Sequence, residues 1–185
     1  MPASLFELLG LRRARTAADA AAAEEAGTDT VRRIVRELEA LDEDTAKFLA
    51  GFAYILSRVA AADHNICHQE TAQMVAILRE RGHLTEAQAM LVVEIAKAQH
   101  TLFGATENFL VTREFKAHAT DEQRRDLLDC LFAVSAADHV ITLDEEAQIR
   151  QVASELGFDH QAFIAARLGY SEHRSVVRGF RERHQ

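Results

Sequence analysis

Two short polar loops hold the residues best suited to binding a metal ion. The first contains Asp63, His64, Cys67 and His68, and Glu70 follows it. Imidazole and thiolate groups are the ligands that Zn²⁺ and other borderline metals prefer. His64, Cys67 and His68 converge if the chain turns helically at Cys67, so this loop predicts a site for Zn²⁺. The simpler interpretation, which we favour for Cys67 and His68, is that these two side chains bind no metal.

The second loop has a different chemistry. It offers four acidic side chains, Asp138, Asp144, Glu145 and Glu146, and one imidazole, His139. Carboxylate oxygens are hard ligands that suit Ca²⁺ or Mg²⁺. The loop is not an EF-hand, because the D-x-D-x-D-G spacing and the distal Glu of that motif are absent.

The two loops belong to an internal sequence repeat. Residues 59–74 match residues 134–149 at a constant offset of 75 positions, and both copies share the pattern A-D-H-x-I-x-x-x-E-x-A-Q. Further along, Glu80 aligns with Glu155. Each copy is predicted to contain the end of an apolar helix, a tight polar loop and the start of the next helix.

The repeat places one aspartate of each copy, Asp63 or Asp138, at the carboxyl end of a helix. The negative end of the helix macrodipole disfavours a bare carboxylate there, and a metal ion, an Arg or a His nearby would relieve this penalty. In the alternative interpretation these residues cap the loop through backbone N–H groups, and Glu70 and Glu145 support the following helix. The pairing of acidic positions in both copies favours a metal site or a charge network.

The repeated unit A-D-x-x-I-x-x-x-E resembles the tellurite-resistance TerB-like family, and the resemblance covers roughly residues 47–170. It implies a compact bundle of about seven to eight helices with an internal pseudo-twofold duplication. It also implies an acidic metal-binding site on the repeated loops and a stress-related role without catalysis. The matching acidic positions are Asp63, Glu70, Asp138 and Glu145. From the chemistry of the side chains alone, the less favoured candidate ligands are His64, Cys67, His68, His139 and Asp144.

The chain departs from the family at one position of each loop. Family members commonly have Gly after the Asp, where this chain has His64 and His139. Gly adopts positive φ readily, whereas His does so less often. We therefore expect the loop backbone to differ from that of the family.

Apolar residues recur with helical spacing through most of the chain. The predicted helices cover about residues 29–38, 44–62, 69–81, 86–99, 107–118, 121–137, 144–156 and 160–168. Thr85 and Thr120 are predicted to be helix N-caps. Gly82 is predicted to end a helix in the left-handed conformation, and a bend is predicted at Gly104. Residues 28–170 should form one helical domain, preceded by an amphipathic helix and Ala-rich linker (1–27) and followed by a polar, solvated tail (171–185).

The composition supports an all-α protein. One Pro, 8 Gly and 6% aromatic residues are too few for the turns and strands of a β-protein. The net charge of −8 argues against a large nucleic-acid-binding surface. No apolar run is as long as a membrane span, which needs about 20 residues. In the N-terminal segment the basic residues follow the apolar ones, which is the reverse of their order in a secretory signal. The two cysteines form no disulfide framework, so we predict a cytoplasmic location.

These features lead to three functional hypotheses. We favour a non-catalytic, cytoplasmic metal-binding or interaction module that takes Ca²⁺, Mg²⁺ or Zn²⁺ as its divalent metal ion. The alternative is a metal-independent helical adaptor that recruits a protein partner, or a membrane surface through the N-terminal helix. A small hydrolase using His64, Cys67 or His139 is disfavoured, because no nucleophile, base and orienting group can be identified together. The expected partners are proteins, including a second copy of the chain in a homodimer, and not nucleic acid.

Overall fold

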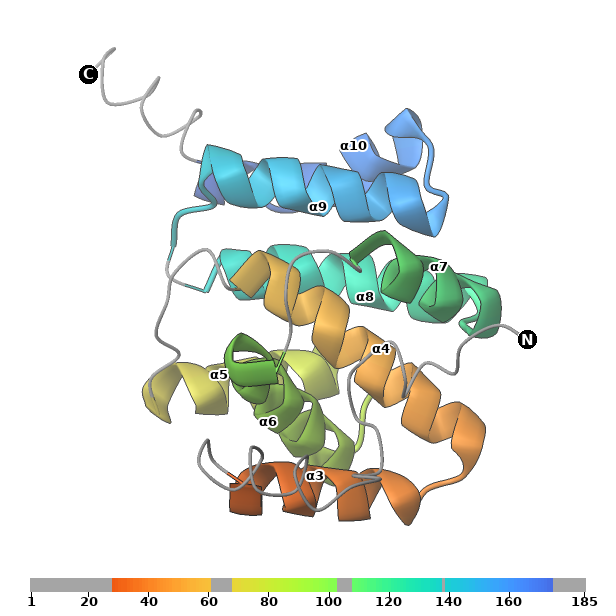
Figure 1. Ribbon diagram of the computed structural model, residues 1–185. Coiled ribbons are helices and arrows are strands. Elements are labelled where there is room, and N and C mark those ends of the chain that lie inside the picture. Colours follow the sequence, from red (N-terminus) through yellow and green to blue (C-terminus); the bar gives the residue numbers. More distant parts are fainter. Residues whose placement is uncertain (1–27, 61–67, 103–107, 138, 175–185) are drawn as a thin grey trace.

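A computed structural model describes residues 28–60, 68–102, 108–137 and 139–174 of the protein. Within these residues the chain is all-α, as predicted, and forms a bundle of eight α-helices followed by a 3₁₀ helix (Figure 1). The elements are α3 (Thr28–Glu39), α4 (Glu43–Ala60), α5 (His68–Arg81), α6 (Glu86–Leu102), α7 (Asn108–His118), α8 (Asp121–Ser135), α9 (Leu143–Leu156), α10 (His160–Leu168) and η3 (Ser171–His173). The segment predicted for residues 1–27 and the predicted bend at Gly104 lie outside the described residues.

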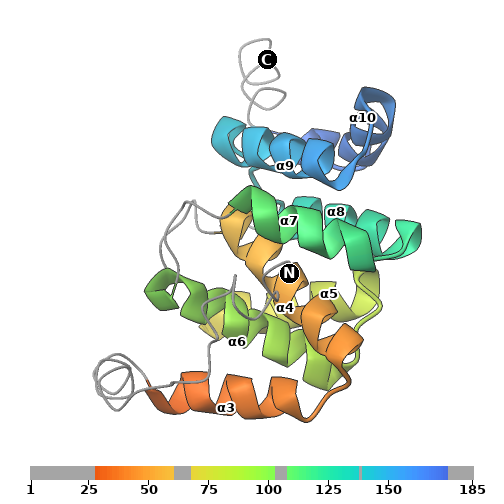
Figure 2. The same ribbon diagram turned by 45° about the vertical axis from the view of Figure 1, so that its right-hand side comes forward.

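Helix α4 lies at the centre of the bundle. It runs obliquely between α3 at one end of the molecule and the layer of α9 and α10 at the other (Figures 1 and 2). It packs against α6, α7, α8 and α9. Every residue from Leu49 to Leu56 is buried. A helix surrounded in this way must be apolar or small on all its faces, and the sequence LAGFAYIL meets that requirement.

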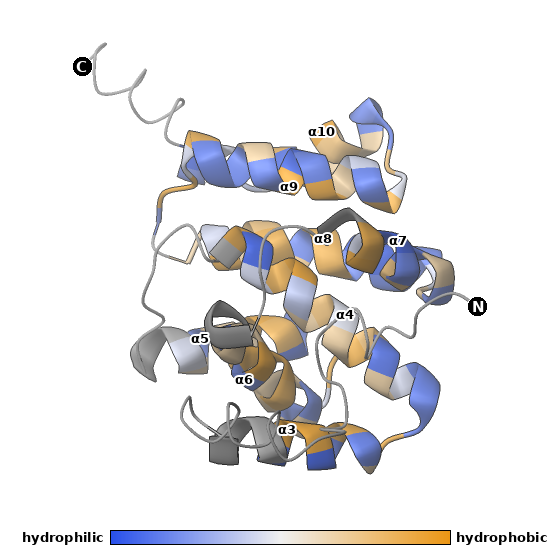
Figure 3. Cartoon of the chain, in the orientation of Figure 1, coloured by the Kyte–Doolittle hydropathy of each residue, from blue (hydrophilic) through white to orange (hydrophobic). Residues whose placement is uncertain are grey.

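Aromatic contacts join helices that are distant in the sequence. Phe48 of α4 stacks on Phe115 of α7, with ring centroids 5.5 Å apart. The ring centroid of Phe132 in α8 lies 5.8 Å from that of Phe163 in α10 and 5.5 Å from that of Tyr170. Figure 3 shows that α6 and the middle of α4 are largely apolar, whereas the side of α9 that faces the viewer is largely hydrophilic. None of the described helices has the length and apolar character needed to cross a membrane.

Thr85 and Thr120 cap the starts of two helices, as predicted, and each cap is completed by a reciprocal hydrogen bond. The Thr85 hydroxyl accepts a hydrogen bond from the Gln88 N–H at 3.3 Å, and the Gln88 side chain accepts one from the Thr85 N–H at 3.0 Å. Thr120 and Gln123 make the same pair of hydrogen bonds at 3.1 and 2.8 Å. These capping boxes satisfy N–H groups that have no partner within the helix.

Helices α5 and α9 lie at the spacing of the sequence repeat. Each has 14 residues, and their first residues, His68 and Leu143, are 75 positions apart. Their ends differ in conformation. Gly157 after α9 is left-handed, with φ +91°, whereas after α5 the left-handed residue is His83, with φ +52°, and not Gly82. The helix bounds agree with the repeat, and the pseudo-twofold duplication itself stays a prediction.

Gly82 is required for close packing and not for its backbone conformation, so its predicted left-handed role is wrong. A Cβ atom at this position would lie 2.7 Å from the Leu78 carbonyl oxygen and 3.2 Å from the Cys130 Sγ of α8. The missing side chain lets the end of α5 approach α8. Cys130 is buried, and burial raises the pKa of its thiol to about 12.

We predict that Gly82→Ala lowers the free energy of unfolding by about 1–3 kcal/mol, because a backbone oxygen and a buried sulfur must move. The matched control is Gly169→Ala. A Cβ at Gly169 would meet its nearest atom at an ordinary 3.5 Å, and φ there is −58°, so a change within about 0.5 kcal/mol is expected. Urea unfolding followed by far-UV circular dichroism measures both. Equal effects would contradict the packing role of Gly82.

Candidate functional site

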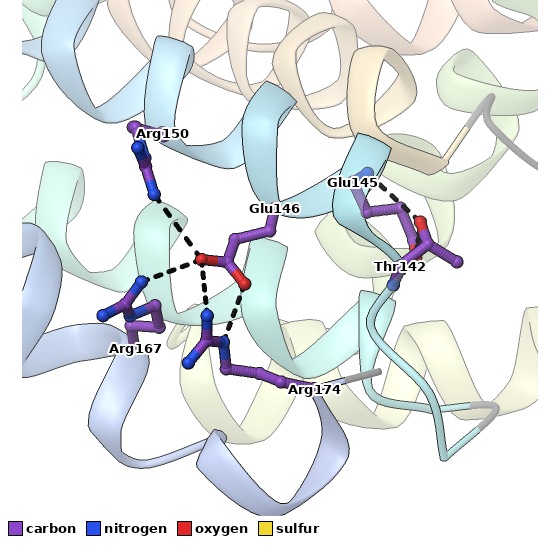
Figure 4. A network of polar contacts seen from close by, with 6 residues as sticks. All are labelled: Thr142, Glu145, Glu146, Arg150, Arg167 and Arg174. Carbon is purple, nitrogen blue, oxygen red and sulfur yellow. Dashed lines mark hydrogen bonds and ion pairs between the residues drawn. The ribbon is translucent and has the colours of Figure 1, made fainter. Parts of the chain in front are cut away.

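The second loop of the repeat ends in a capping box at the start of α9. The Thr142 hydroxyl accepts a hydrogen bond from the Glu145 N–H at 3.2 Å. In return, Glu145 Oε2 accepts from the Thr142 N–H and hydroxyl, both at 2.8 Å (Figure 4). Helix α9 therefore begins at Leu143, one residue before its predicted start. Glu145, which is buried, supports the first turn of the helix, as the alternative interpretation of the sequence proposed.

The backbone of the second loop is left-handed at His139, where φ is +74°. The His139 N–H donates to the Ala136 carbonyl at 2.9 Å, which closes the turn after α8. The expected departure from a Gly-type backbone is therefore not seen at this position. His139 adopts the conformation that Gly takes readily, at the steric cost of its Cβ.

Three of the nine predicted metal ligands have described side chains. Glu145 is buried, whereas His139 and Asp144 are exposed. The others lie outside the described residues (Asp63, His64, Cys67 and Asp138) or have only their backbone described, in the first turn of α5 (His68 and Glu70). Within the described part of the chain, no three His, Cys, Asp or Glu side chains gather as a metal ion requires. A metal site on these loops stays a prediction that depends on Asp63 and Asp138.

A direct contact brings the two copies of the repeat together. The Gln73 side-chain amide of α5 donates to the Ala137 carbonyl at 3.3 Å. Gln73 follows Glu70 by three residues, and Ala137 directly precedes Asp138. Helix α5 also packs along α8. The beginning of α5 and the second loop are therefore neighbours.

Glu146, the fourth acidic residue of the second loop, is bound by arginines. Its buried carboxylate accepts hydrogen bonds from Arg174 Nε at 2.7 Å, Arg174 Nη2 at 3.1 Å and Arg167 Nη1 at 2.9 Å, and Arg150 Nη2 lies 3.7 Å away (Figure 4). Burial raises the pKa of Glu146, but the bonds from Arg174 and Arg167 outweigh it and hold that pKa below its ordinary value. The prediction that Arg174 belongs to a solvated tail is therefore wrong.

Residues Tyr170–Arg174, which we call the C-terminal strap, cover the second loop. The Ile141 N–H donates to the His173 carbonyl at 2.7 Å. At the beginning of the strap, the Tyr170 hydroxyl donates to Asp129 Oδ1 of α8 at 2.7 Å. Sequence reasoning missed the strap, because these contacts join residues far apart in the chain and no periodic pattern marks them.

A buried ion pair joins three helices. Arg58 of α4 donates to Glu155 of α9, with Nη1 2.7 Å from Oε2 and Nη2 3.3 Å from Oε1. Arg58 Nη1 also donates to the Thr112 hydroxyl of α7 at 2.8 Å. The two charged side chains are only 6% and 9% exposed. Burial raises the pKa of Glu155, and the hydrogen bonds and charge of Arg58 more than reverse this effect, so the pKa is lowered.

The described residues thus define a small all-α protein built around a buried central helix, with a polar helix–loop–helix corner held by caps and ion pairs. The chain belongs to the tellurite-resistance TerB family, because the family model described as "Tellurite resistance protein TerB" matches residues 49–168. This match confirms the resemblance predicted from the repeat. No curated protein and no solved structure matches the chain significantly.

We predict that Glu155→Gln lowers the free energy of unfolding by about 3–5 kcal/mol at neutral pH, because it removes the carboxylate charge that pairs with the buried Arg58 guanidinium. The matched control is Glu80→Gln, at the equivalent position of the repeat, where the side chain is exposed and a change within about 0.5 kcal/mol is expected. Urea unfolding measures both variants. A similar small effect of the two substitutions would show that the buried pair is not needed for stability.

The lowered pKa values of Glu146 and Glu155 predict a loss of stability in acid. Because both groups are more acidic in the folded protein than their ordinary value of 4.5, their ion pairs stabilise it fully above that pH. The contribution is lost as the pH falls from 4.5 through the folded pKa values. Unfolding free energies measured in steps from pH 7 to pH 3 should show this fall, and Glu155→Gln should make it less steep. An unchanged slope in the variant would contradict the assignment.

Proposed function

We propose that the protein is a non-catalytic, cytoplasmic module that binds a divalent metal ion between its two repeated loops and serves in stress-related assemblies. Asp63 and Asp138 are the first-choice ligands, and Glu70 and Glu145 are the second. The TerB family match supports the class of protein. The metal site itself is an inference from the repeated carboxylates and from the contact between the two copies.

The hydrogen bond between Gln73 and Ala137 carries this proposal. It joins the helix that begins beside the first loop to the residue that precedes Asp138. We infer that this contact brings the carboxylates of the two loops close enough to repel one another unless a cation lies between them. A divalent ion would therefore stabilise the pairing of the loops as well as be held by it.

Glu145 has one carboxylate oxygen available for a ligand. Both of its cap hydrogen bonds go to Oε2, and Oε1 receives none from the described residues. The other two capping boxes place Gln88 or Gln123 at the same position, so the cap does not require a carboxylate. A carboxylate oxygen suits Ca²⁺ or Mg²⁺, and Zn²⁺ is favoured if the first loop contributes imidazole or thiolate.

We predict that Glu145→Gln separates the cap from the metal site. The amide oxygen can accept the same cap hydrogen bonds, so the free energy of unfolding in chelator should stay within about 0.5 kcal/mol of the wild type. Affinity for the metal should fall about tenfold or more, because a charged oxygen is replaced by a neutral one. Isothermal titration calorimetry with Ca²⁺, Mg²⁺ and Zn²⁺ measures the affinity, and urea unfolding measures the cap.

The double variant Asp63→Ala plus Asp138→Ala should abolish binding. Its matched control, Glu39→Gln plus Glu80→Gln, removes the same charge from exposed helix positions and should bind as the wild type does. The site assignment is wrong if none of the three ions binds below the millimolar range. It is also wrong if the double variant retains the wild-type affinity.

A metal-independent adaptor is the second candidate. It is favoured by the arginine pairing of Glu146 and Glu155, which neutralises buried acidic groups without a metal ion. Leu143 and Leu168 are large apolar side chains exposed on the surface and suit a protein partner. The partner would be another protein, a second copy of the chain or a membrane surface bound by the N-terminal helix, and not nucleic acid. Thermal unfolding unchanged by chelator, together with a dimer or complex seen by light scattering, would support this function.

A further inference from the structure

Three guanidinium groups, from Arg150 of α9, Arg167 of α10 and Arg174 of the C-terminal strap, surround the buried carboxylate of Glu146. Nitrogens of Arg150, Arg167 and Arg174 all lie within 3.7 Å of Glu146 Oε1, at 3.7, 2.9 and 3.1 Å respectively. No other carboxylate among the described residues pairs with these arginines. The cluster therefore carries two positive charges in excess, on a chain whose net charge is −8. Like charges this close raise the free energy of the cluster unless anions offset them.

Much of the hydrogen-bonding capacity of the cluster is unused. Arg174 commits Nε and Nη2 to Glu146, and Arg167 commits Nη1. Arg150 makes only a loose ion pair at 3.7 Å, and its side chain is 58% exposed. Since a guanidinium carries five N–H donors in a planar fork, the arginines retain donors that reach solvent. Arg167 and Arg174 are 20% and 19% exposed.

Two of the arginines lie over the ring of Phe163. The guanidinium carbons of Arg150 and Arg167 lie 5.4 and 5.7 Å from its centroid. In Figure 4 these two side chains approach Glu146 from the same side, whereas Arg174 approaches it from below. Stacking on an aromatic face restricts a guanidinium and leaves its N–H edge available. Arg150 and Arg167 therefore lie on one side of Glu146, where the 58% exposed Arg150 faces solvent.

We propose that Arg150 and Arg167 bind a dianionic phosphate group, with Glu146 and Arg174 as positioning residues. A phosphate with two negative charges offsets the excess charge of the cluster. Its oxygens match the paired N–H donors of arginine, which favour planar, bidentate recognition. The ligand is either free phosphate or the phosphate of a monoester, since both present the same group. This site is separate from the proposed metal site, and neither depends on the other.

Isothermal titration calorimetry in EDTA, with inorganic phosphate and glycerol 3-phosphate as the two probes, tests the proposal. EDTA removes any metal ion that could bridge to phosphate, so the outcome is independent of the metal site. Binding of either probe in the millimolar range or tighter is expected. Equal affinities identify the free anion as sufficient, and tighter binding of glycerol 3-phosphate identifies a monoester as the ligand. In ¹⁵N spectra, the Arg150 and Arg167 Nε–H resonances should shift on addition of the tighter probe.

Arg150→Gln should weaken the binding about fivefold or more, because one charge-assisted contact is lost at a partly screened position. Its exposure and loose ion pair mean that the urea midpoint should not change. The matched control is Arg79→Gln, which removes a 53% exposed arginine with a similar loose pair at 3.5 Å and should bind as the wild type does. The proposal is overturned if neither probe binds, or if Arg150→Gln and Arg79→Gln have the same affinity.

Discussion

The ion pair between Arg58 and Glu155 fixes how the central helix meets the second half of the bundle. Its two side chains carry charge into the interior, where an unpaired charge costs several kcal/mol. An arrangement that places Glu155 opposite Arg58 avoids that cost, so the pair favours one position of α9 along α4. Because α9 is a continuous helix, fixing Glu155 near its carboxyl end also fixes where its amino end lies. Glu146 lies nine residues before Glu155 in the same helix, about 14 Å away along its axis, so the pair also determines where the capping box and the arginine cluster stand.

Much of the helical architecture could be predicted from local sequence. Helical periodicity predicted the elements from α3 to α10, and Thr85 and Thr120 were identified as caps from their positions at the start of predicted helices. The Thr142 cap was missed, although Glu145 has the spacing of a capping box. At α4 the cap is Asp42, which accepts a hydrogen bond from the Thr45 N–H at 2.9 Å, so the helix begins before Asp44. These errors are small because capping depends on neighbouring residues, which the sequence displays directly.

The candidate site was harder to predict, because its groups are defined by partners that are remote in the chain. Glu80 and Glu155 are equivalent in the repeat, yet one is exposed and the other forms a buried pair with Arg58, 97 positions away. Glu146 and Arg174 are 28 positions apart with no pattern that links them. Glu145 shows a further difficulty. A carboxylate at this position of a helix can serve a cap or a metal ion, and the residue type is the same in both cases.

The C-terminal strap has a consequence for the order in which the protein acquires its structure during synthesis. The Ile141 N–H bonds to the carbonyl of His173, which the ribosome adds 32 residues later. At about 5–20 residues per second, that interval lasts about 2–6 seconds. Until then the Ile141 amide lacks this partner, and Glu146 lacks Arg174. The first copy of the repeat lies 75 positions before the second and is synthesised earlier. The two copies of one sequence pattern therefore acquire their contacts at different times. The contacts of the second copy are complete only after the C-terminal strap has been synthesised.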